Sequence, residues 1–187
     1  MDSKRDKCRR LFFALEPTLF VRKQLVVVRD QVAVANRGRA VTDSNLHLTL
    51  QFIGSCPAET VSELQLAADA LRAKQFSLVL DRFGYWKRPR VLWLGSQITP
   101  VPLLALHAGL ETVLKRELGI DLEPRSYTPH VTLMRKVGQV EELPNFPPLE
   151  WVVDSFSLME SISTQKGVHY HTISSWKLDG AGSKPVG

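Results

Sequence analysis

The sequence predicts a mixed α and β domain in which helices and strands are interspersed along 187 residues. Apolar residues recur at spacings of three and four in three segments, which is typical of amphipathic helices. In other segments apolar and polar residues alternate with the two-residue period of half-buried strands. The order of these elements starts again in the second half of the chain, which indicates two similar halves.

The first half begins with a basic leader over residues 1–9, which we expect to be flexible. Residues 10–15 follow as a strand with branched and aromatic character. A helix is predicted to begin at Pro17 and to end near Gly38. Its apolar face has residues at spacings of four and three: Val21, Leu25, Val28, Val32 and Ala35.

Residues 45–53 alternate as a strand with one polar face, and we expect it to end at Gly54. The predicted apolar face is Leu46, Leu48, Leu50 and Phe52, and the polar face is His47, Thr49 and Gln51. A second helix is predicted to begin at Pro57, and residues 76–80 alternate as another strand.

The middle of the chain predicts a hairpin. Strands over residues 83–86 and 91–95 flank the basic turn Lys87-Arg88-Pro89-Arg90. A third helix follows Pro100 and ends at Gly119, a residue that suits a left-handed C-terminal cap.

The last part of the chain predicts three strands, over residues 127–134 and around residues 151–158 and 169–176. In the first of them, alternation places three side chains on one face: His130, Thr132 and Met134. Residues 179–187 resemble a flexible tail, so we expect one domain over residues 10–178.

Composition and charge restrict the classes of function. A hydrophobic share of 44% and a charged share of 23% are ordinary for a chain that folds around its own core. The net charge of +5 favours anionic partners without identifying one. Two cysteines, Cys8 and Cys56, are too few for a disulfide framework, so we expect a reducing, cytoplasmic setting. No apolar run approaches the ~20 residues of a membrane-spanning helix.

The strongest functional signal is a pattern that occurs twice, as His47-Leu48-Thr49-Leu50 and His130-Val131-Thr132-Leu133. Within a strand each copy places an imidazole and a hydroxyl on one face, ~6–7 Å apart at ~3.3 Å per residue. Two such strands facing each other would surround a small anion with hydroxyl donors and titratable rings. The unperturbed pKa of histidine, ~6.5, lets one ring act as base and the other as acid. The pattern therefore predicts a phosphate site that cleaves a P–O bond without a metal.

Each copy alone has a simpler explanation, because a histidine on a half-buried strand is usually a surface or hydrogen-bonded residue, and threonine is common in strands. The coincidence favours function: two of five histidines fall in one pattern, at corresponding positions of two similar halves. No G-x-S-x-G elbow and no G-x-x-x-x-G-K-[ST] loop occurs, so a serine hydrolase and a phosphate-loop nucleotide site have no support.

Two other residues have both a functional and a structural interpretation, and a third has a structural one. Arg135 is a candidate ligand for a phosphate or a base, although strict alternation places it on the face opposite Thr132 unless the strand bulges. Phe13 either stacks on a nucleobase or packs in the core, and the pair Phe12-Phe13 predicts one ring on each side of the sheet, one of them accessible. His107 is most simply a boundary residue of an amphipathic helix.

The remaining histidines and basic residues give weaker signals. His169 and His171 share a strand face as two metal ligands would, but no further ligands accompany them, so we expect no metal site. The basic turn at residues 87–90, with Arg37 and Arg39, either follows an RNA backbone or is simply solvated.

These residues together resemble the two-histidine phosphoesterases, and within them the bacterial RNA 2′,3′-cyclic phosphodiesterases, also called 2′-5′ RNA ligase-like proteins. The resemblance covers nearly the whole chain and rests on residues 10–15, 45–54, 89–95 and 129–135, and on Tyr170 followed by 176–178. Many relatives have a tryptophan a few residues before the first histidine, where this chain has Arg39-Ala40-Val41.

The resemblance implies an α+β fold of two pseudo-symmetric lobes, each an antiparallel sheet with helices on the outside, and an active site in the central groove. It implies an enzyme, an RNA 2′,3′-cyclic 3′-phosphodiesterase, that hydrolyses an RNA-terminal 2′,3′-cyclic phosphate to a 2′-phosphate end. His130 would be the proton acceptor that activates water, and His47 the proton donor to the departing O3′. Thr49 and Thr132 would hold the nonbridging oxygens.

Alternatives remain open at this point. Reversal of the reaction would give 2′-5′ RNA ligation, and a related enzyme would open 2′-5′ bonds in oligonucleotides. A nucleotide- or RNA-binding module without turnover is a different class. We expect RNA ends or small 2′,3′-cyclic nucleotides as partners, no cofactor, no metal, no membrane and a monomer.

Overall fold

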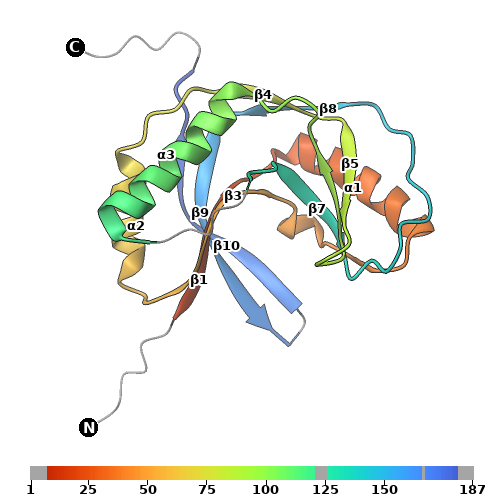
Figure 1. Cartoon of the computed structure of the whole chain (residues 1–187), viewed down its shortest axis with the longest axis horizontal. Coiled ribbons are helices and arrows are strands. Elements are labelled where there is room, and N and C mark those ends of the chain that lie inside the picture. The colour runs from red at the N-terminus through yellow and green to blue at the C-terminus, as the bar shows by residue number, and fades with distance from the viewer. Residues whose placement is uncertain (1–7, 121–125, 166, 181–187) are drawn as a thin grey trace.

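The computed structural model describes residues 8–120, 126–165 and 167–180, which form two lobes around a shared sheet (Figure 1). The predicted leader and tail lie mostly outside these residues. The described structure reaches beyond the predicted domain at both ends. Arg9 begins the first strand, and the backbone N–H of Asp179 donates to Ala73 O at 2.8 Å.

The elements follow the predicted order. In sequence they are β1 (Arg9–Leu15), α1 (Leu19–Ala35), β2 (Arg39–Ala40), η1 (Asp43–Asn45), β3 (Leu48–Cys56), α2 (Thr60–Asp69), β4 (Phe76–Leu80), β5 (Arg82–Trp86), β6 (Val91–Gly95), α3 (Val101–Leu118), β7 (His130–Arg135), β8 (Leu149–Val153), β9 (Ser155–Thr164) and β10 (Gly167–Lys177). The three predicted helices and the predicted hairpin are confirmed, whereas β2 and η1 were not predicted.

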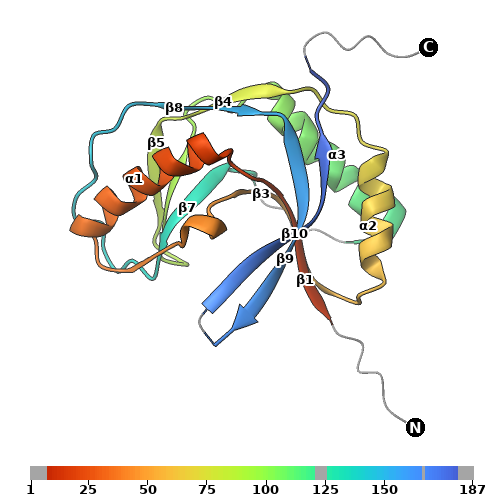
Figure 2. The same ribbon diagram turned by 180° about the vertical axis from the view of Figure 1, so that it is seen from behind.

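The main sheet has the order β10-β9-β1-β3-β7-β6-β5, with β2 also paired to β7. It consists of two half-sheets, because β3 and β7 pair only through Leu48 and Val131. Helices α2 and α3 lie over the half-sheet that ends at β3, and α1 lies over the half-sheet that begins at β7 (Figures 1 and 2). The two-lobed α+β prediction is confirmed, and the sheet is continuous through this one pair.

The helices bury the apolar faces that their periodicity predicts. In α1 the buried residues include Val21, Leu25, Val28 and Val32, and in α3 they are Leu103, Leu106, Leu110 and Leu114. Gly119 ends α3 in the left-handed conformation, with φ of 61°, as expected for its cap. Helix α1 begins at Leu19 and not at Pro17, because the Thr18 hydroxyl accepts a hydrogen bond from Val21 N at 3.3 Å and caps the helix.

The first motif strand contains a β-bulge that the sequence did not reveal. Thr49 and Gln51 pair with consecutive residues of β1, which leaves Leu50 as an extra residue. A bulge reverses the alternation beyond it. Gln51 is therefore buried and Phe52 is 49% exposed, so the prediction that Phe52 shares the buried face of Leu48 is wrong. The strand also continues beyond Gly54, where a positive φ of 94° suits glycine.

The second motif strand has its bulge at the matching position. Thr132 and Met134 pair with consecutive residues of β6, which leaves Leu133 as the extra residue. Leu133 and Met134 are both buried, so the prediction that Met134 shares a face with His130 and Thr132 is wrong. The fourth residue of each H-x-T-x pattern is thus the bulged one.

The predicted strand at residues 151–158 is two strands. Asp154 separates β8 from β9, and its backbone carbonyl accepts a hydrogen bond from Leu178 N at 2.8 Å. Strand β8 pairs with β4 in a separate two-stranded sheet, whereas β9 pairs with β1 and β10. Apolar periodicity does not reveal this turn, because buried apolar residues occur on both sides of it.

Close packing between β5 and β6 gives a stability prediction. A Cβ atom added at Gly84 would overlap the indole ring of Trp93, whereas one added at Gly138 would meet nothing within 4 Å. We expect Gly84→Ala to lower the free energy of unfolding by ~1–3 kcal/mol through overpacking. Gly138→Ala should change it by less than ~0.5 kcal/mol. Urea unfolding followed by circular dichroism measures both variants, and equal stabilities would contradict this account.

Candidate active site

The two H-x-T-x motifs meet at the junction of the half-sheets. Leu48 pairs with Val131 in an antiparallel register, which places His47 across from Thr132 and Thr49 across from His130. Leu48 and Val131 are fully buried, so the four flanking side chains lie on the opposite face of the sheet. The structure therefore brings together the two histidines and two threonines that the sequence identified.

Each histidine ring is held by a backbone carbonyl two residues before it. His47 Nδ1 lies 2.7 Å from Asn45 O, and His130 Nδ1 lies 2.8 Å from Thr128 O. Because a carbonyl oxygen only accepts, each Nδ1 carries the proton and donates it. Nε2 of each ring is then the atom available for proton transfer. His47 Nε2 lies 3.0 Å from Thr49 Oγ1 in the same motif.

The His47 ring is enclosed by two aromatic side chains. Its centroid lies 5.1 Å from the ring of Phe12 on β1 and 4.8 Å from the ring of Tyr170 on β10, which meets it edge-on. Phe12 and Tyr170 also contact each other in a T-shaped pair, with centroids 5.1 Å apart. These rings remove water from one side of the imidazole.

The His130 ring has an equivalent wall from the second half-sheet. Trp86 on β5 meets it edge-on with centroids 4.5 Å apart, and Trp93 on β6 lies at 5.9 Å. Trp93 pairs directly with Thr132, so its side chain is on the same face as the motif. The two histidines thus lie between two aromatic walls, one from each lobe.

Burial decides the protonation of both rings. The pKa of His47 is lowered to about 4, chiefly because burial disfavours the charged ring, and the Asn45 carbonyl acts in the opposite direction. The charges of Arg135 and His130 lower it further, and that of Glu16 raises it. The pKa of His130 is also lowered, first by burial, then by Arg135, against the Thr128 carbonyl. With no anion bound, both rings are therefore neutral at pH 7.

Arg135 is the predicted ligand whose position depended on a bulge. The bulge at Leu133 reverses the alternation, so Arg135 returns to the face of His130 and Thr132. Its side chain is exposed, and its charge lowers the pKa of both motif histidines. We use the name histidine groove for the sheet face that carries both motifs between the two aromatic walls, and these observations place a cation at its edge.

The structure contradicts the prediction for Phe13. Its side chain is fully buried and packs against Phe156 and Trp176, with centroids 6.2 and 6.0 Å apart. Phe12 is on the groove side but is only 3% exposed, because Tyr170 covers it. Neither ring is accessible for stacking on a base, so the predicted base contact at Phe13 is wrong.

Asn45 is a site residue that sequence reasoning missed. Its side chain is buried, donates from Nδ2 to Val168 O at 2.6 Å, and accepts at Oδ1 from Tyr170 N at 3.2 Å. Its own backbone carbonyl orients His47. Asn45 therefore attaches β10, and with it the Tyr170 ring, to the segment that holds His47. Its place two residues before His47 was visible in the sequence, but its partners are more than 120 positions away.

A second connection joins the two motifs. The Tyr127 hydroxyl, three residues before His130, donates to Thr49 O at 3.2 Å. The Tyr127 ring stacks on His107 of α3 with centroids 3.8 Å apart, and Gln51 Nε2 lies 3.1 Å from His107 Nε2. His107 thus has a structural role beside the first motif strand, as its simpler interpretation predicted.

His169 and His171 lie on exposed positions of β10, on the face opposite Tyr170. Within residues 8–120, 126–165 and 167–180, no group of three or more His, Cys, Asp or Glu side chains is arranged to hold a metal ion. In the same residues no helix is long and apolar enough to cross a membrane.

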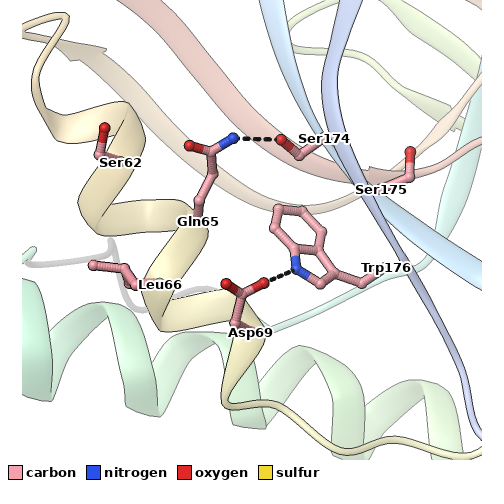
Figure 3. Close-up of a pocket in the computed structure, with 7 residues that line it drawn as sticks. All are labelled: Ser62, Gln65, Leu66, Asp69, Ser174, Ser175 and Trp176. Carbon is pink, nitrogen blue, oxygen red and sulfur yellow. Dashed lines mark hydrogen bonds between the residues drawn. The ribbon is translucent and has the colours of Figure 1, made fainter.

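A hollow of about 540 Å³ lies elsewhere, between α2 and β10 (Figure 3). Its lining residues are Ser62, Gln65, Leu66, Asp69, Ser174, Ser175 and Trp176. Two hydrogen bonds cross it, from Gln65 Nε2 to Ser174 Oγ at 2.5 Å and from Trp176 Nε1 to Asp69 Oδ1 at 2.6 Å. It contains no residue of either motif, so the acid–base chemistry is not located there.

The sequence is similar to a protein family and to several known proteins over most of its length. A family model described as the 2′-5′ RNA ligase superfamily matches residues 22–165. A protein of Escherichia coli (strain K12) named RNA 2′,3′-cyclic phosphodiesterase is 34% identical over 171 residues, covering 90% of this chain and 96% of the relative. A Thermotoga maritima protein of the same name is 31% identical over 183 residues, covering 91% and 96%.

Solved structures show the same fold. The crystal structure of E. coli LigT complexed with 3′-AMP has a TM-score of 0.81 and 34% identity, covering 92% of this chain and 99% of that chain. The crystal structure of TT0787 of Thermus thermophilus has a TM-score of 0.74 and 27% identity, covering 92% and 100%.

Titration of the histidine rings tests the geometry of the groove. We expect His47 to titrate at about 4 and to have its proton on Nδ1 at pH 7, because burial disfavours the charged ring and Asn45 O accepts from Nδ1. Added inorganic phosphate should raise this pKa, since an anion stabilises the imidazolium. Ring ¹⁵N NMR, with the signal assigned by its loss in His47→Gln, measures both. A His47 pKa near 6.5 that phosphate leaves unchanged would contradict the arrangement.

Proposed function

The chain belongs to the 2′-5′ RNA ligase superfamily, and we propose that it hydrolyses RNA-terminal 2′,3′-cyclic phosphates to 2′-phosphate ends with its paired histidines. One observation is central. The two H-x-T-x motifs lie on one face of one sheet, and each presents Nε2 of a ring whose Nδ1 is fixed by a backbone carbonyl. Such a pair suits a reaction in which one proton is removed and another is supplied.

The proposed step is an in-line displacement at phosphorus. Water attacks the cyclic phosphate while His130 Nε2 takes its proton, so that a new P–O bond forms as the P–O3′ bond breaks. His47 Nε2 gives its proton to the departing O3′, which becomes a 3′-hydroxyl. The phosphate remains on O2′ as a monoester, and the two rings end with their protonation states exchanged.

The anionic substrate itself supplies the charge that His47 needs. A unit negative charge 4 Å from the ring contributes ~4 kcal/mol at an effective dielectric constant of ~20. That energy changes the protonation equilibrium about a thousandfold, enough for a ring with a pKa of about 4 to be protonated near neutral pH. The charge of Glu16 raises the pKa of His47, but the larger effects of burial, Arg135 and His130 lower it, so the assignment of His47 as the donor follows the family resemblance and not the electrostatics of the rings.

The remaining groove residues suit the nonbridging oxygens. Thr49 and Thr132 are hydroxyl donors across the strand junction from the two rings. Arg135 is exposed at the same face and can balance the charge that develops on the phosphate. Burial first, and then the charge of Arg135, lowers the pKa of both rings, which leaves a neutral base at His130.

Several predictions about the cellular setting stay predictions. RNA ends and small 2′,3′-cyclic nucleotides both fit a groove that recognises the phosphate and the atoms beside it. We retain a monomer as the expected state, and the two cysteines favour a reducing, cytoplasmic setting. The same displacement with a 5′-hydroxyl in place of water would join the two ends through a 2′-5′ bond, with His130 taking the proton of that hydroxyl and O3′ again leaving as a 3′-hydroxyl.

A direct assay tests the reaction and the two histidines. Incubation of a short RNA ending in a 2′,3′-cyclic phosphate, with EDTA present, should give a 2′-phosphate product identified by phosphorus NMR. We expect His47→Gln and His130→Gln each to lower kcat by at least ~100-fold, because each removes a proton-transfer group. Urea unfolding checks that both variants are folded.

The outcomes distinguish the alternatives. Hydrolysis that survives either substitution, or stops in EDTA, would contradict the mechanism. Cleavage of internal 2′-5′ bonds with the cyclic end untouched would indicate the oligonucleotide phosphodiesterase. Tight nucleotide binding with no product over hours would indicate a binding module.

Asn45 gives a second test, with Asn36 as a matched control. Both side chains are buried amides with hydrogen bonds to distant backbone groups, but Asn36 joins α1 to residues 141–142 and lies outside the site. Each Asn→Ala change should cost ~1–3 kcal/mol of stability. Only Asn45→Ala should lower kcat, by about tenfold, because Tyr170 and His47 lose their alignment. In that variant KM should change little, and the NMR signal of His47 should shift. An equal loss of kcat in both variants would mean that Asn45 acts through stability alone.

A further inference from the structure

We infer that the RNA strand on the 5′ side of the cyclic phosphate lies over a basic end of the second half-sheet, an inference that rests on the proposed function. The basic end comprises Arg39, Lys87, Arg88, Arg90, Arg135 and Lys136. All six side chains are exposed, and they come from three separate parts of the chain. A substrate longer than one nucleotide must place its phosphates somewhere beyond the histidines, and these residues are suited to receive them.

Strand pairing and hydrogen bonds bring together the segments that carry the six cations, although the guanidinium of Arg39 itself extends to Gly167 at the start of β10. Arg135 pairs with Arg39 on one side and with Val91, which follows Arg90, on the other. The backbone N–H of Val137 donates to Arg90 O at 3.1 Å, and the Tyr85 hydroxyl donates to Val137 O at 2.7 Å. The turn at residues 87–90 is therefore attached to the end of β7, next to Lys136.

The charge of the basic end is not neutralised locally. The segments 37–41, 87–95 and 130–139 contain no acidic residue. Among the described residues none of the six cations forms an ion pair, whereas Arg9 and Arg29 do, with Glu160 and with Asp30 and Asp43. Like charges directly opposite each other in a sheet, as Arg39 and Arg135 are, destabilise it. Such a cluster suits a polyanionic ligand better than a structural role.

The basic end is continuous with the histidine groove. Arg135 belongs to both, since its charge lowers the pKa of His47 and of His130. Trp86 contacts His130 edge-on and immediately precedes Lys87, so it lies between the reacting phosphate and the turn. Its side chain is partly exposed, and an exposed indole face is a stacking surface for a base.

The other wall of the groove has a carboxylate beside His47. The charge of Glu16 acts on His47, and Glu16 accepts a hydrogen bond from Thr172 Oγ1 at 3.0 Å. The nearby strands contribute the closed pair Phe12 and Tyr170. A single-stranded polyanion would meet this carboxylate and two covered rings beside His47, whereas Trp86 and the cations of the turn lie beside His130, so the path from the histidines toward the turn is favoured.

The test compares two substrates of one enzyme. The variant Lys87→Gln, Arg88→Gln, Arg90→Asn removes three charges of the turn, with asparagine at position 90 because φ is 65° there. For a six-nucleotide RNA with a 2′,3′-cyclic end, we expect kcat/KM to fall at least about tenfold at moderate salt. The slope of log kcat/KM against log salt concentration should become shallower by about two, because each of the three lost phosphate contacts contributes ~0.7 to that slope. For 2′,3′-cyclic AMP, kcat/KM should stay within about twofold.

A second triple variant controls for net charge. Lys74→Gln, Lys115→Gln, Arg116→Gln removes the same charge from exposed positions after α2 and at the end of α3, and should leave both substrates unaffected. The inference would be overturned if the turn variant lost activity equally on both substrates, or lost it on neither. It would also be overturned if the control variant lost activity on the RNA as the turn variant does. In each of these cases the proposed hydrolysis of cyclic phosphates would still stand. If the unaltered enzyme hydrolysed neither substrate, the proposed function would fail and this inference with it.

Discussion

The backbone pairing of Leu48 with Val131 is the contact on which the site depends. It is the single pair that joins β3 to β7, and it lies at the start of both strands. Both side chains are fully buried, so the pair is held by the core beneath it as well as by its hydrogen bonds. The residues on either side of it are the histidines and threonines, which the antiparallel register sets diagonally across from one another. Beyond the pair, β3 continues beside β1 and β7 beside β6 and β2, so each lobe holds its own half of the site while one shared pair fixes their relation.

The bulges explain how two similar halves supply different groups. Each bulge falls at the fourth residue of its motif, Leu50 or Leu133. Strict alternation would place the residue two positions after the bulge on the core face, but the bulge places it on the face of the histidines. In the second lobe that residue is Arg135, whose charge reaches both histidines. In the first lobe the corresponding residue is Phe52, which is half-exposed and lies beneath the Arg10 guanidinium at 4.9 Å. A β-bulge at the same motif position therefore directs a cation toward the groove in one lobe and an aromatic ring toward a surface arginine in the other.

The sequence predicted those parts of the site that depend on period alone. Two-residue alternation predicted that His47 and Thr49 share a strand face, and that His130 and Thr132 do so too. Because the pattern recurs in two similar halves, it also indicated that the two motifs lie together in one site. Alternation failed for Phe52 and Met134 because a bulge depends on the partner strand, which a single sequence does not display. The predicted base contact of Phe13 was wrong for a related reason, because side chains of β9 and β10 cover the face of β1 on which Phe13 lies. Asn45 escaped notice because its partners on β10 lie far away along the chain.

The aromatic walls make the protonation of the groove depend on its ligand. Burial lowers the pKa of His47 to about 4 in the folded chain, below the ~6.5 of an unfolded one. As the pH falls below ~6.5 the unfolded chain binds this proton first, so the ring removes stability progressively until the pH reaches about 4. An anion between the rings reverses the balance, because its charge favours the imidazolium that burial disfavours. The groove therefore acquires its acid when the phosphate enters it, and the proposed mechanism requires the other ring to stay neutral as the base. The charges near the rings do not divide these roles, since Arg135 lowers the pKa of both rings and His130 lowers that of His47. In the proposed in-line displacement the roles follow instead from position, because the acid is the ring beside the departing O3′ and the base is the ring beside the attacking water.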